Sequence, residues 1–384
     1  MLKLGYRNYL LVLLIVAGVA TNFERFVFSL VLEPIKNELH LSDGQLGLMT
    51  GMAFFAFYAL AGIPIARWAD RGNRVTITTM AVGLCGVMVS LCGMASSFFT
   101  LLFVRAGVAI GEAGVIPAGQ SLLSDYFNRA ERPRILGFYI SFYSISMIIG
   151  FLLGGWLVES LGWRLTFMVI GLPGLLVAIL VKTTLVEPRL ENPPQLSAKS
   201  ESLFDALALL WQQRTFRKVL ILFCLGYFFN AGVSQWLPTF LIRTYDMSMS
   251  EVGAWLALAF GGFGTFGVFL GGHLASRYAA HREKFQMRIL ALTTITYGLL
   301  LAFAYLAKDK YISIVFISLA AVFMMANNGP LFAAIQSLVK DHMRSLAVAT
   351  TFMFGNLIGL GFGPLVLGLI SDALHPSFGQ DSLR

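Results

Sequence analysis

Two long apolar runs of this sequence are joined by a short basic turn, residues 66–74, which reads ARWADRGNR. The run before the turn covers about residues 44–66, and the run after it covers about residues 75–96. Each run has roughly the 20 residues that a helix needs to cross the hydrocarbon core of a bilayer, about 30 Å thick. The turn and its flanking runs therefore predict a pair of membrane-spanning helices.

The same alternation of apolar runs and polar breaks continues almost to the end of the 384 residues. Hydrophobic residues make up 57% of the chain and charged residues 12%, whereas a soluble protein carries about 25% charged residues. This composition excludes a soluble globular protein and predicts an all-α polytopic membrane protein. We expect eleven spanning helices, the other nine lying near residues 9–32, 98–125, 135–158, 164–182, 218–242, 251–275, 286–306, 311–338 and 346–371.

The basic residues are distributed unevenly between the loops. Most of the 28 lysines and arginines fall on the side of the membrane that holds the N-terminus. Since cytoplasmic loops are enriched in these residues, we expect a cytoplasmic N-terminus and an integral protein of a bacterial cytoplasmic (inner) membrane. The same asymmetry accounts for the net charge of +8, so the charge does not indicate binding to nucleic acid.

The longest connection divides the chain into two halves. Residues 1–184 are expected to form an N-terminal bundle of six helices, and residues 218–384 a C-terminal bundle of five, with a twelfth helix expected beyond residue 384. In the cytoplasmic linker, residues 185–217, a capping pattern at Ser202 and an apolar face predict a short amphipathic helix on the membrane surface. An ordinary linker helix packed on the bundles is the alternative.

Four charged residues lie inside the predicted spans. Arg105 and Glu112 share a face of the fourth helix and stand about 10.5 Å apart along its axis, while Glu24 and Arg25 lie in the first helix. Glu24 and Arg105 have similar depths, so we expect them to pair. A charge at mid-membrane costs about 2.5 to 3.5 kcal/mol, so these residues are expected to face a watery cavity and to function there. A buried ion pair that only fixes packing is the alternative.

The turn at 66–74 resembles the signature loop of the major facilitator superfamily. Several further stretches resemble its spinster-like branch, namely Glu24-Arg25, residues 105–113, Ser124-Asp125-Tyr126-Phe127 and Gly162-Trp163-Arg164. Members of that branch usually have Asp-Arg where this chain has Glu24-Arg25. The resemblance implies the major facilitator fold, two pseudo-symmetric bundles of helices.

The resemblance also implies a function, which is proton-coupled transport of an amphiphilic lipid, such as a lysophospholipid or a sphingolipid, by alternating access. Carried over by position, Glu24 and Glu112 would couple protons, and Arg105 with Arg25 would bind the head group or exchange ion-pair partners. Asp70, Arg71 and Arg74 would form a cytoplasmic gate. The alternatives are transport of a small organic anion or drug, and a lipid-binding receptor that does not transport.

Other polar features are weaker. Asn327, Asn328, Gln336 and Asn356 are expected either to line the C-terminal side of the cavity or to form hydrogen bonds between helices. Residues 262–267 match the dinucleotide pattern Gly-x-Gly-x-x-Gly, but they lie in an apolar run without a preceding strand, which favours helix packing. The three cysteines and the histidines show no metal spacing. We therefore expect no cofactor. We also expect that the protein is a monomer and is not an enzyme.

Overall fold

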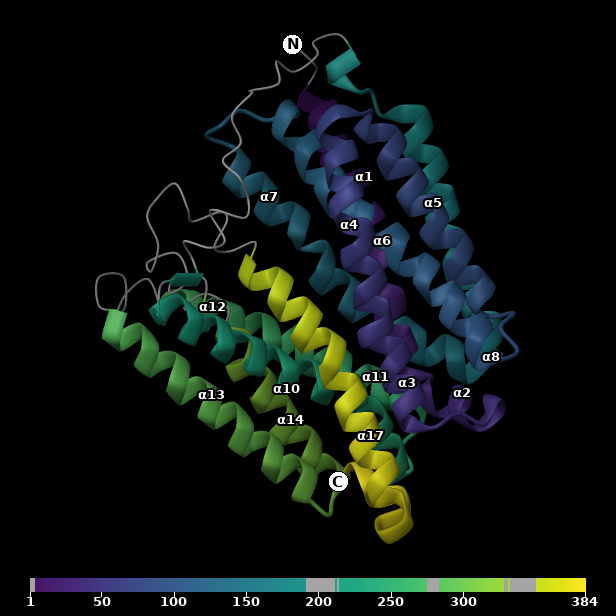
Figure 1. Cartoon of the computed structure of the whole chain (residues 1–384), viewed down its shortest axis with the longest axis vertical. Helices are drawn as coiled ribbons and strands as arrows, with labels where there is room; N and C mark the ends of the chain where they lie inside the picture. The colour runs from purple at the N-terminus through teal and green to yellow at the C-terminus, as the bar shows by residue number, and fades with distance from the viewer. Residues whose placement is uncertain (1–3, 191–210, 213, 275–282, 328–330, 332–349) are drawn as a thin grey trace. The chain divides into compact units, whose positions relative to one another are not determined.

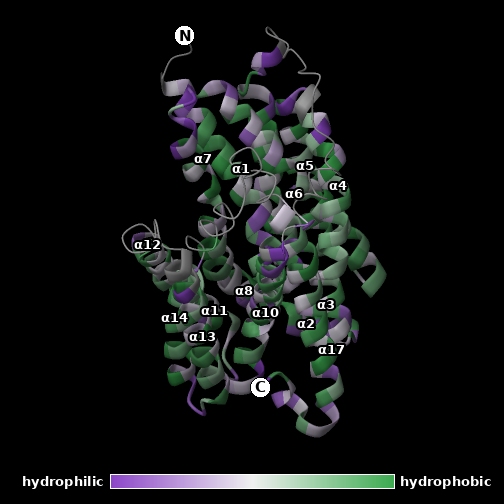
Figure 2. Cartoon of the chain, turned by 60° about the vertical axis from the view of Figure 1, so that its left-hand side comes forward, coloured by the Kyte–Doolittle hydropathy of each residue, from purple (hydrophilic) through white to green (hydrophobic). Residues whose placement is uncertain are grey.

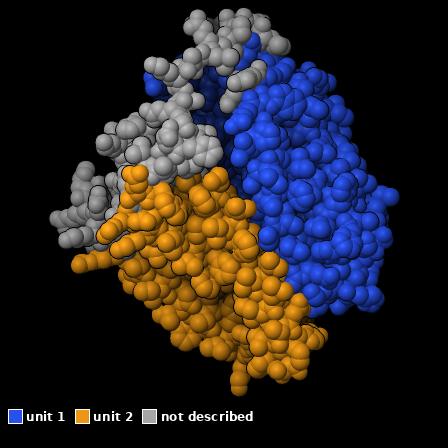
Figure 3. Space-filling model, in the orientation of Figure 1, with its two compact units in different colours: residues 1–196 blue, residues 197–384 orange. Residues whose placement is uncertain are grey.

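The computed structural model describes residues 4–190, 211–212, 214–274, 283–327, 331 and 350–384 (Figure 1). The described residues form helices and connecting turns, without β-strands. The chain divides into two compact units, residues 1–196 and residues 197–384 (Figure 3). The amphipathic helix expected from Ser202 lies outside the described residues.

The described part of unit 1, residues 4–190, contains eight α-helices. They are α1 Leu4–Leu30, α2 Leu32–Leu39, α3 Asp43–Thr50, α4 Met52–Arg71, α5 Arg74–Cys92, α6 Phe98–Tyr126, α7 Arg132–Ile140 and α8 Phe142–Thr184. Polar side chains begin several of them: Asn73 accepts a hydrogen bond from the backbone of Thr76, and Ser97 accepts one from the backbone of Thr100. These caps satisfy backbone N–H groups that have no partner inside the helix.

The fifth and sixth expected spans are joined in α8. The helical path is broken at Gly162, which has φ +74° and ψ 163°. This left-handed φ suits glycine, because other residues carry a Cβ that clashes there. Beyond the break, Trp163 Nε1 and Arg164 Nε donate hydrogen bonds of 2.6 and 2.7 Å to the Glu38 carboxylate. The bond from Arg164, followed by that from Trp163, lowers the pKa of Glu38. One carboxylate thus ties α2 to the turn within α8.

Unit 2 contains the remaining described helices. They are α10 Arg214–Tyr245, α11 Met249–Leu256, α12 Gly264–Leu274, α13 Glu283–Leu306, α14 Lys310–Ala326 and α17 Gly361–Phe378, with π-helical turns η2 Ala257–Phe263 and η5 Gly355–Leu360 and a closing 3₁₀ turn η6 Gly379–Leu383. The last predicted span, near residues 346–371, ends within α17. The helix runs on to Phe378, and η6 then folds back so that the hydroxyls of Ser371 and Ser382 lie 2.9 Å apart.

The described residues include nine helical stretches that are long and apolar enough to cross a membrane. One of them, Arg132–Thr184, contains two of the expected spans, and the shorter α14 covers the described part of another. Each apolar run predicted to span the membrane therefore coincides with a helix over the residues that the structure describes. Figure 2 shows hydrophobic residues along most of the length of these helices.

The charged residues lie on α1 and α6, and glycines allow each of these helices to pack closely against a neighbouring helix. A Cβ added at Gly111 of α6 would lie 2.8 Å from the backbone oxygen of Ala81 in α5, so the two backbones touch there. In α8, Gly150 lies in the same way against the backbone oxygen of Phe23 in α1, and Gly154 lies against the side chain of Val27. Because α1 also contacts α6, the charges of α1 and α6 come together inside unit 1.

Candidate functional site

The four intramembrane charges gather between α1 and α6. Glu24 and Arg25 are consecutive on α1, whereas Arg105 and Glu112 lie two turns apart on α6. The exposed fraction is 0% for Glu24, 3% for Arg105 and 2% for Glu112, while Arg25 keeps 19% of its side chain exposed. Three of the four charges are therefore removed from solvent.

The charges form two ion pairs. Arg105 Nη1 lies 2.5 Å from Glu24 Oε2, which is the pair that the sequence predicts. Arg25 Nε lies 2.8 Å from Glu112 Oε2, a pair that the sequence analysis missed because it considered only depth along each helix. Within the described residues, Glu24 Oε1 and Arg105 Nε take part in no hydrogen bond. The Glu24–Arg105 pair thus rests on a single contact.

Aromatic rings surround both guanidinium groups. The Arg105 guanidinium lies 4.2 Å from the ring centre of Phe28 and 4.7 Å from that of Phe54. The Arg25 guanidinium lies 4.6 Å from the same Phe54 ring, and 5.1 and 5.8 Å from those of Phe55 and Tyr58. All are within the range of cation–π attraction. The buried Phe54 therefore contacts both arginines and links the two ion pairs.

Sequence reasoning did not find these aromatic residues. The available signal was the aromatic run FFAFY at residues 54–58, directly after the start of α4. In a chain with 33 phenylalanines such a run does not stand out, because most of them face lipid or fill the core. Only the packing of α4 on α6 brings this run to the arginines.

A second charged cluster lies where α5 and α6 meet the segment after α8. Arg74, one of the predicted gate residues, is fully buried. Its guanidinium pairs with Glu187 and lies 2.6 Å from Asp125 Oδ2, and it donates a 2.9 Å hydrogen bond to the backbone oxygen of Ser121. Burial of a charge is tolerated here because it has carboxylate partners.

Arg189 closes the same cluster. It lies 3.2 Å from Asp125 and donates a 3.1 Å hydrogen bond to the backbone oxygen of Ala69, at the end of α4. Burial raises the pKa of Glu187, but hydrogen bonds from Arg74 and from the backbone of Arg189 outweigh it, so the pKa is lowered. The side chains of Asp70 and Arg71, the other predicted gate residues, lie outside the described part of the chain.

The polar residues predicted to line a cavity in unit 2 lie in different surroundings. Asn327 receives a hydrogen bond from the Thr293 hydroxyl and donates one of 3.3 Å to Thr294, both on α13. It therefore joins two helices, as one of the two interpretations predicts. Asn356 is half-buried in the π-helical turn η5. Asn328 and Gln336 are not among the described residues.

The glycine pattern at 262–267 is a packing feature. A Cβ added at Gly264 would lie 3.2 Å from Met325, and one added at Gly267 would collide with the Val322 backbone, both in α14. The pattern thus lets α12 approach α14, as expected. Among the described residues, no group of three or more histidine, cysteine or acidic side chains could hold a metal ion.

Residues 13–364 match the sequence model of the Major Facilitator Superfamily. The chain belongs to the major facilitator superfamily. Members of this superfamily are membrane transporters and not enzymes, so this chain is an integral membrane transporter with the major facilitator fold.

Three comparisons within the superfamily are informative. An efflux pump of Mycolicibacterium smegmatis is 32% identical to this chain, over 96% of this chain and 86% of the pump. A probable L-galactonate transporter of Escherichia coli is 25% identical, over 95% of this chain and 83% of that protein. The crystal structure of a bacterial homolog to the human lysosomal transporter Spinster, inward-facing and unoccupied, is 30% identical, with a TM-score of 0.86 over 98% of this chain and 85% of that chain. The chain therefore resembles the spinster-like branch.

Proposed function

We propose that this transporter moves an amphiphilic lipid with a charged head group, a lysophospholipid or sphingolipid, and that protons drive the movement. The observation that carries the proposal is the pair of buried ion pairs, Glu24–Arg105 and Arg25–Glu112, which share the ring of Phe54. The likeness to a solved bacterial homolog of the lysosomal transporter Spinster agrees with the spinster-like resemblance from which the expectation of a lipid substrate comes.

Because these pairs are buried, proton uptake by a glutamate would lead its arginine to bind a different anion. Removing one partner of a buried ion pair costs about 3 to 5 kcal/mol, because the other charge stays in apolar surroundings without compensation. Glu24 avoids this cost when it takes up a proton, since the neutral acid no longer needs Arg105. The released Arg105 then needs another anion, and the phosphate of a lipid head group provides one.

The aromatic rings lower the cost of this exchange. Cation–π attraction is worth about 0.5 to 2 kcal/mol, and Phe28 and Phe54 provide it to Arg105 whichever anion is present. They hold the guanidinium in place while its partner changes. Arg25, with Glu112 as its partner and the same Phe54 ring beside it, would undergo the same exchange.

The proposal extends to the working of the whole chain. The bundles, residues 1–184 and 218–384, would rock about the linker at 185–217, with the N-terminus in the cytoplasm of a bacterial cell. Asp70 and Arg71 would belong to the cytoplasmic gate. Arg74 would stabilise the gate from inside the bundle, because its guanidinium is buried against Asp125 and Glu187.

A small organic anion is the second candidate substrate. Its support is the 25% identity to a probable L-galactonate transporter, together with the two arginines, which suit a carboxylate as well as a phosphate.

Uptake into proteoliposomes tests the proposal. A labelled lysophospholipid is offered to the reconstituted protein with and without an imposed pH gradient, and a labelled sugar acid is offered in parallel. We expect lipid accumulation that depends on the gradient, and we expect Glu24→Gln and Glu112→Gln to lose that dependence. Glu131→Gln is the control, because it removes an exposed ion pair with Arg7 and should leave uptake unchanged.

Each other outcome selects among the candidates. Accumulation of the sugar acid without lipid movement would favour the organic anion. Lipid binding without accumulation would overturn the proposal that the lipid is the transported substrate. Lipid uptake with unchanged pH dependence in both glutamine variants would overturn the assignment of Glu24 and Glu112.

A further inference from the structure

Helices α5 and α8 of unit 1 diverge along their contact and leave a groove between them. At Gly86 the two backbones touch, since an added Cβ would lie 2.8 Å from the backbone oxygen of Gly171. One turn earlier in α5, at Gly83, the same addition would meet only the Cβ of Ala178, at the ordinary distance of 3.5 Å. The two helices are therefore closest at Gly86 and leave more room at Gly83.

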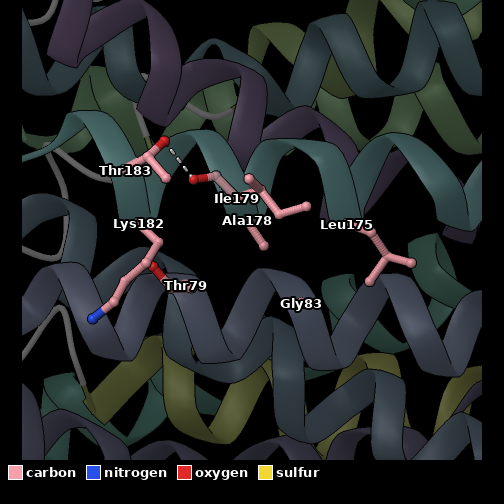
Figure 4. A pocket seen from close by; sticks show the side chains of 7 residues that line it. All are labelled: Thr79, Gly83, Leu175, Ala178, Ile179, Lys182 and Thr183. Carbon is pink, nitrogen blue, oxygen red and sulfur yellow. Dashed lines mark hydrogen bonds between the residues drawn. The ribbon is translucent and has the colours of Figure 1, made fainter.

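The groove has an apolar floor and one charged end. It is shallow and open, has a volume of about 460 Å³, and is lined by Thr79, Gly83, Leu175, Ala178, Ile179, Lys182 and Thr183 (Figure 4). Leu175 marks one end, and Lys182 and Thr183 mark the other (Figure 4). Ile179 is 59% exposed, so the groove opens on a face that α8 presents to its surroundings. In a membrane-spanning pair of helices, those surroundings are lipid.

Lys182 makes the groove favourable for an anionic ligand. Among the residues that line the groove, it is the one cation, and none is acidic. Its Nζ makes a long hydrogen bond of 3.4 Å to the Thr76 hydroxyl, and it forms no ion pair within the described residues. The hydroxyls of Thr79 and Thr183 already donate to the backbone of their own helices. The ammonium group is thus the donor available to an anion at this end.

The dimensions match one leaflet of a bilayer. From Leu175 to Thr183 the groove follows eight residues of α8, which is about 12 Å at 1.5 Å per residue. One leaflet of the hydrocarbon core is about 15 Å thick, half of the full 30 Å. An acyl chain in the groove would therefore lie beside the helices while its head group reached Lys182.

We propose that the groove between α5 and α8 binds an anionic phospholipid of the bilayer, with an acyl chain over Gly83 and Ala178 and its phosphate at Lys182. This site is separate from the four intramembrane charges, because all of its lining residues belong to α5 and α8. The inference does not depend on which substrate is transported. It places a resident lipid on the surface of the N-terminal bundle, where it would fill the space that the diverging helices leave.

Native mass spectrometry of the purified chain tests the proposal, with phosphatidylglycerol and phosphatidylcholine of identical acyl chains added separately. We expect Lys182→Gln to weaken phosphatidylglycerol binding about fivefold and to leave phosphatidylcholine binding unchanged, since one lysine near a membrane surface is worth about 1 kcal/mol. We expect Gly83→Phe to weaken binding of both lipids, because the ring fills the groove. Gly83→Ala and Arg129→Gln are the matched controls and should bind as the wild type does.

A photoactivatable phosphatidylglycerol with a diazirine on its acyl chain gives a second measurement on the unaltered protein. We expect labelled peptides from residues 79–87 and 172–183. Labelling that leaves out both segments would overturn the proposal, even if Gly83→Phe did not fold. Equal phosphatidylglycerol binding by the wild type and Lys182→Gln would also overturn it.

Discussion

At the scale of single residues, the arrangement of two acids and two arginines matters more than their number. Consecutive residues of α1 pair with residues two turns apart on α6, so neither helix contains a pair of its own. The four charges are balanced as long as α1 and α6 keep their contact. The balance between carboxylates and arginines changes when a carboxylate takes up a proton, when an anion binds, or when one helix shifts. Such a change is a suitable basis for coupled transport.

We predict that Glu24→Gln destabilises the protein by about 3 to 5 kcal/mol, because Arg105 then remains buried without its carboxylate. The double variant with Glu24→Gln and Arg105→Gln should be more stable than the single variant, since it leaves no uncompensated charge. Thermal unfolding of the purified variants in one detergent measures both. A double variant less stable than Glu24→Gln would contradict the prediction.

Phe54 gives a second prediction at this scale. Phe54→Leu keeps an apolar side chain but removes the ring that both guanidinium groups face. We expect a loss of about 1 to 3 kcal/mol in stability, combining two cation–π contacts with a small packing change. Phe99→Leu is the matched control, since this ring is 77% exposed and no arginine of the described residues lies over it. The prediction fails if the melting temperatures of the two variants fall equally.

At the scale of helices, glycine contacts decide how closely the elements of unit 1 approach. We expect Gly86→Ala to destabilise the bundle by about 1 to 3 kcal/mol, because its Cβ would lie 2.8 Å from a backbone oxygen that cannot move aside alone. Gly83→Ala, one turn away, should change stability by less than about 0.5 kcal/mol. The difference in melting temperature between the two variants is the measurement. Equal melting temperatures would contradict the close contact of α5 and α8 at Gly86.

The Arg74 cluster also acts at this scale, because it joins α5 and α6 to the segment after α8. The pKa of Glu187 in the folded protein lies below its ordinary value of about 4.3. The ionised carboxylate therefore adds stability above about pH 4.3, and this contribution is lost as the pH falls through the lowered pKa. We expect the melting temperature of the wild type to fall more steeply below about pH 4.3 than that of Glu187→Gln. Parallel curves would show that Glu187 makes no such contribution.

At the scale of the whole molecule, the distribution of basic residues predicts the orientation in the membrane. The three native cysteines are buried and free, so they give little background in labelling experiments. We expect an impermeant maleimide to label Ser96→Cys in intact cells and to label Arg129→Cys only after the membrane is opened. Both positions are exposed in turns at the two ends of α6. The reverse pattern would place the N-terminus outside.

Much of this architecture could be predicted from the sequence, since a bilayer imposes one simple requirement. Every spanning segment must be apolar for about 20 residues and must satisfy its backbone internally, so the runs at 75–96 and 98–125 read directly as the helices α5 and α6. Helix depth could also be counted, and this is why the Glu24–Arg105 pair was expected. Its counterpart, Arg25–Glu112, could not be found by depth alone.

The tertiary structure decided what depends on rotation about the helix axes and on packing between distant segments. The burial of Arg74 follows from Asp125 and Glu187, which lie 51 and 113 positions further along the chain and become its partners only through packing. The aromatic run on α4 contacts the arginines because α4 packs on α6. Hydrophobicity along a chain fixes which segments enter the membrane and for what length. It does not fix which faces meet, because lipid solvates every apolar face equally well, and the choice is left to close contacts between small residues and to the pairing of buried charges.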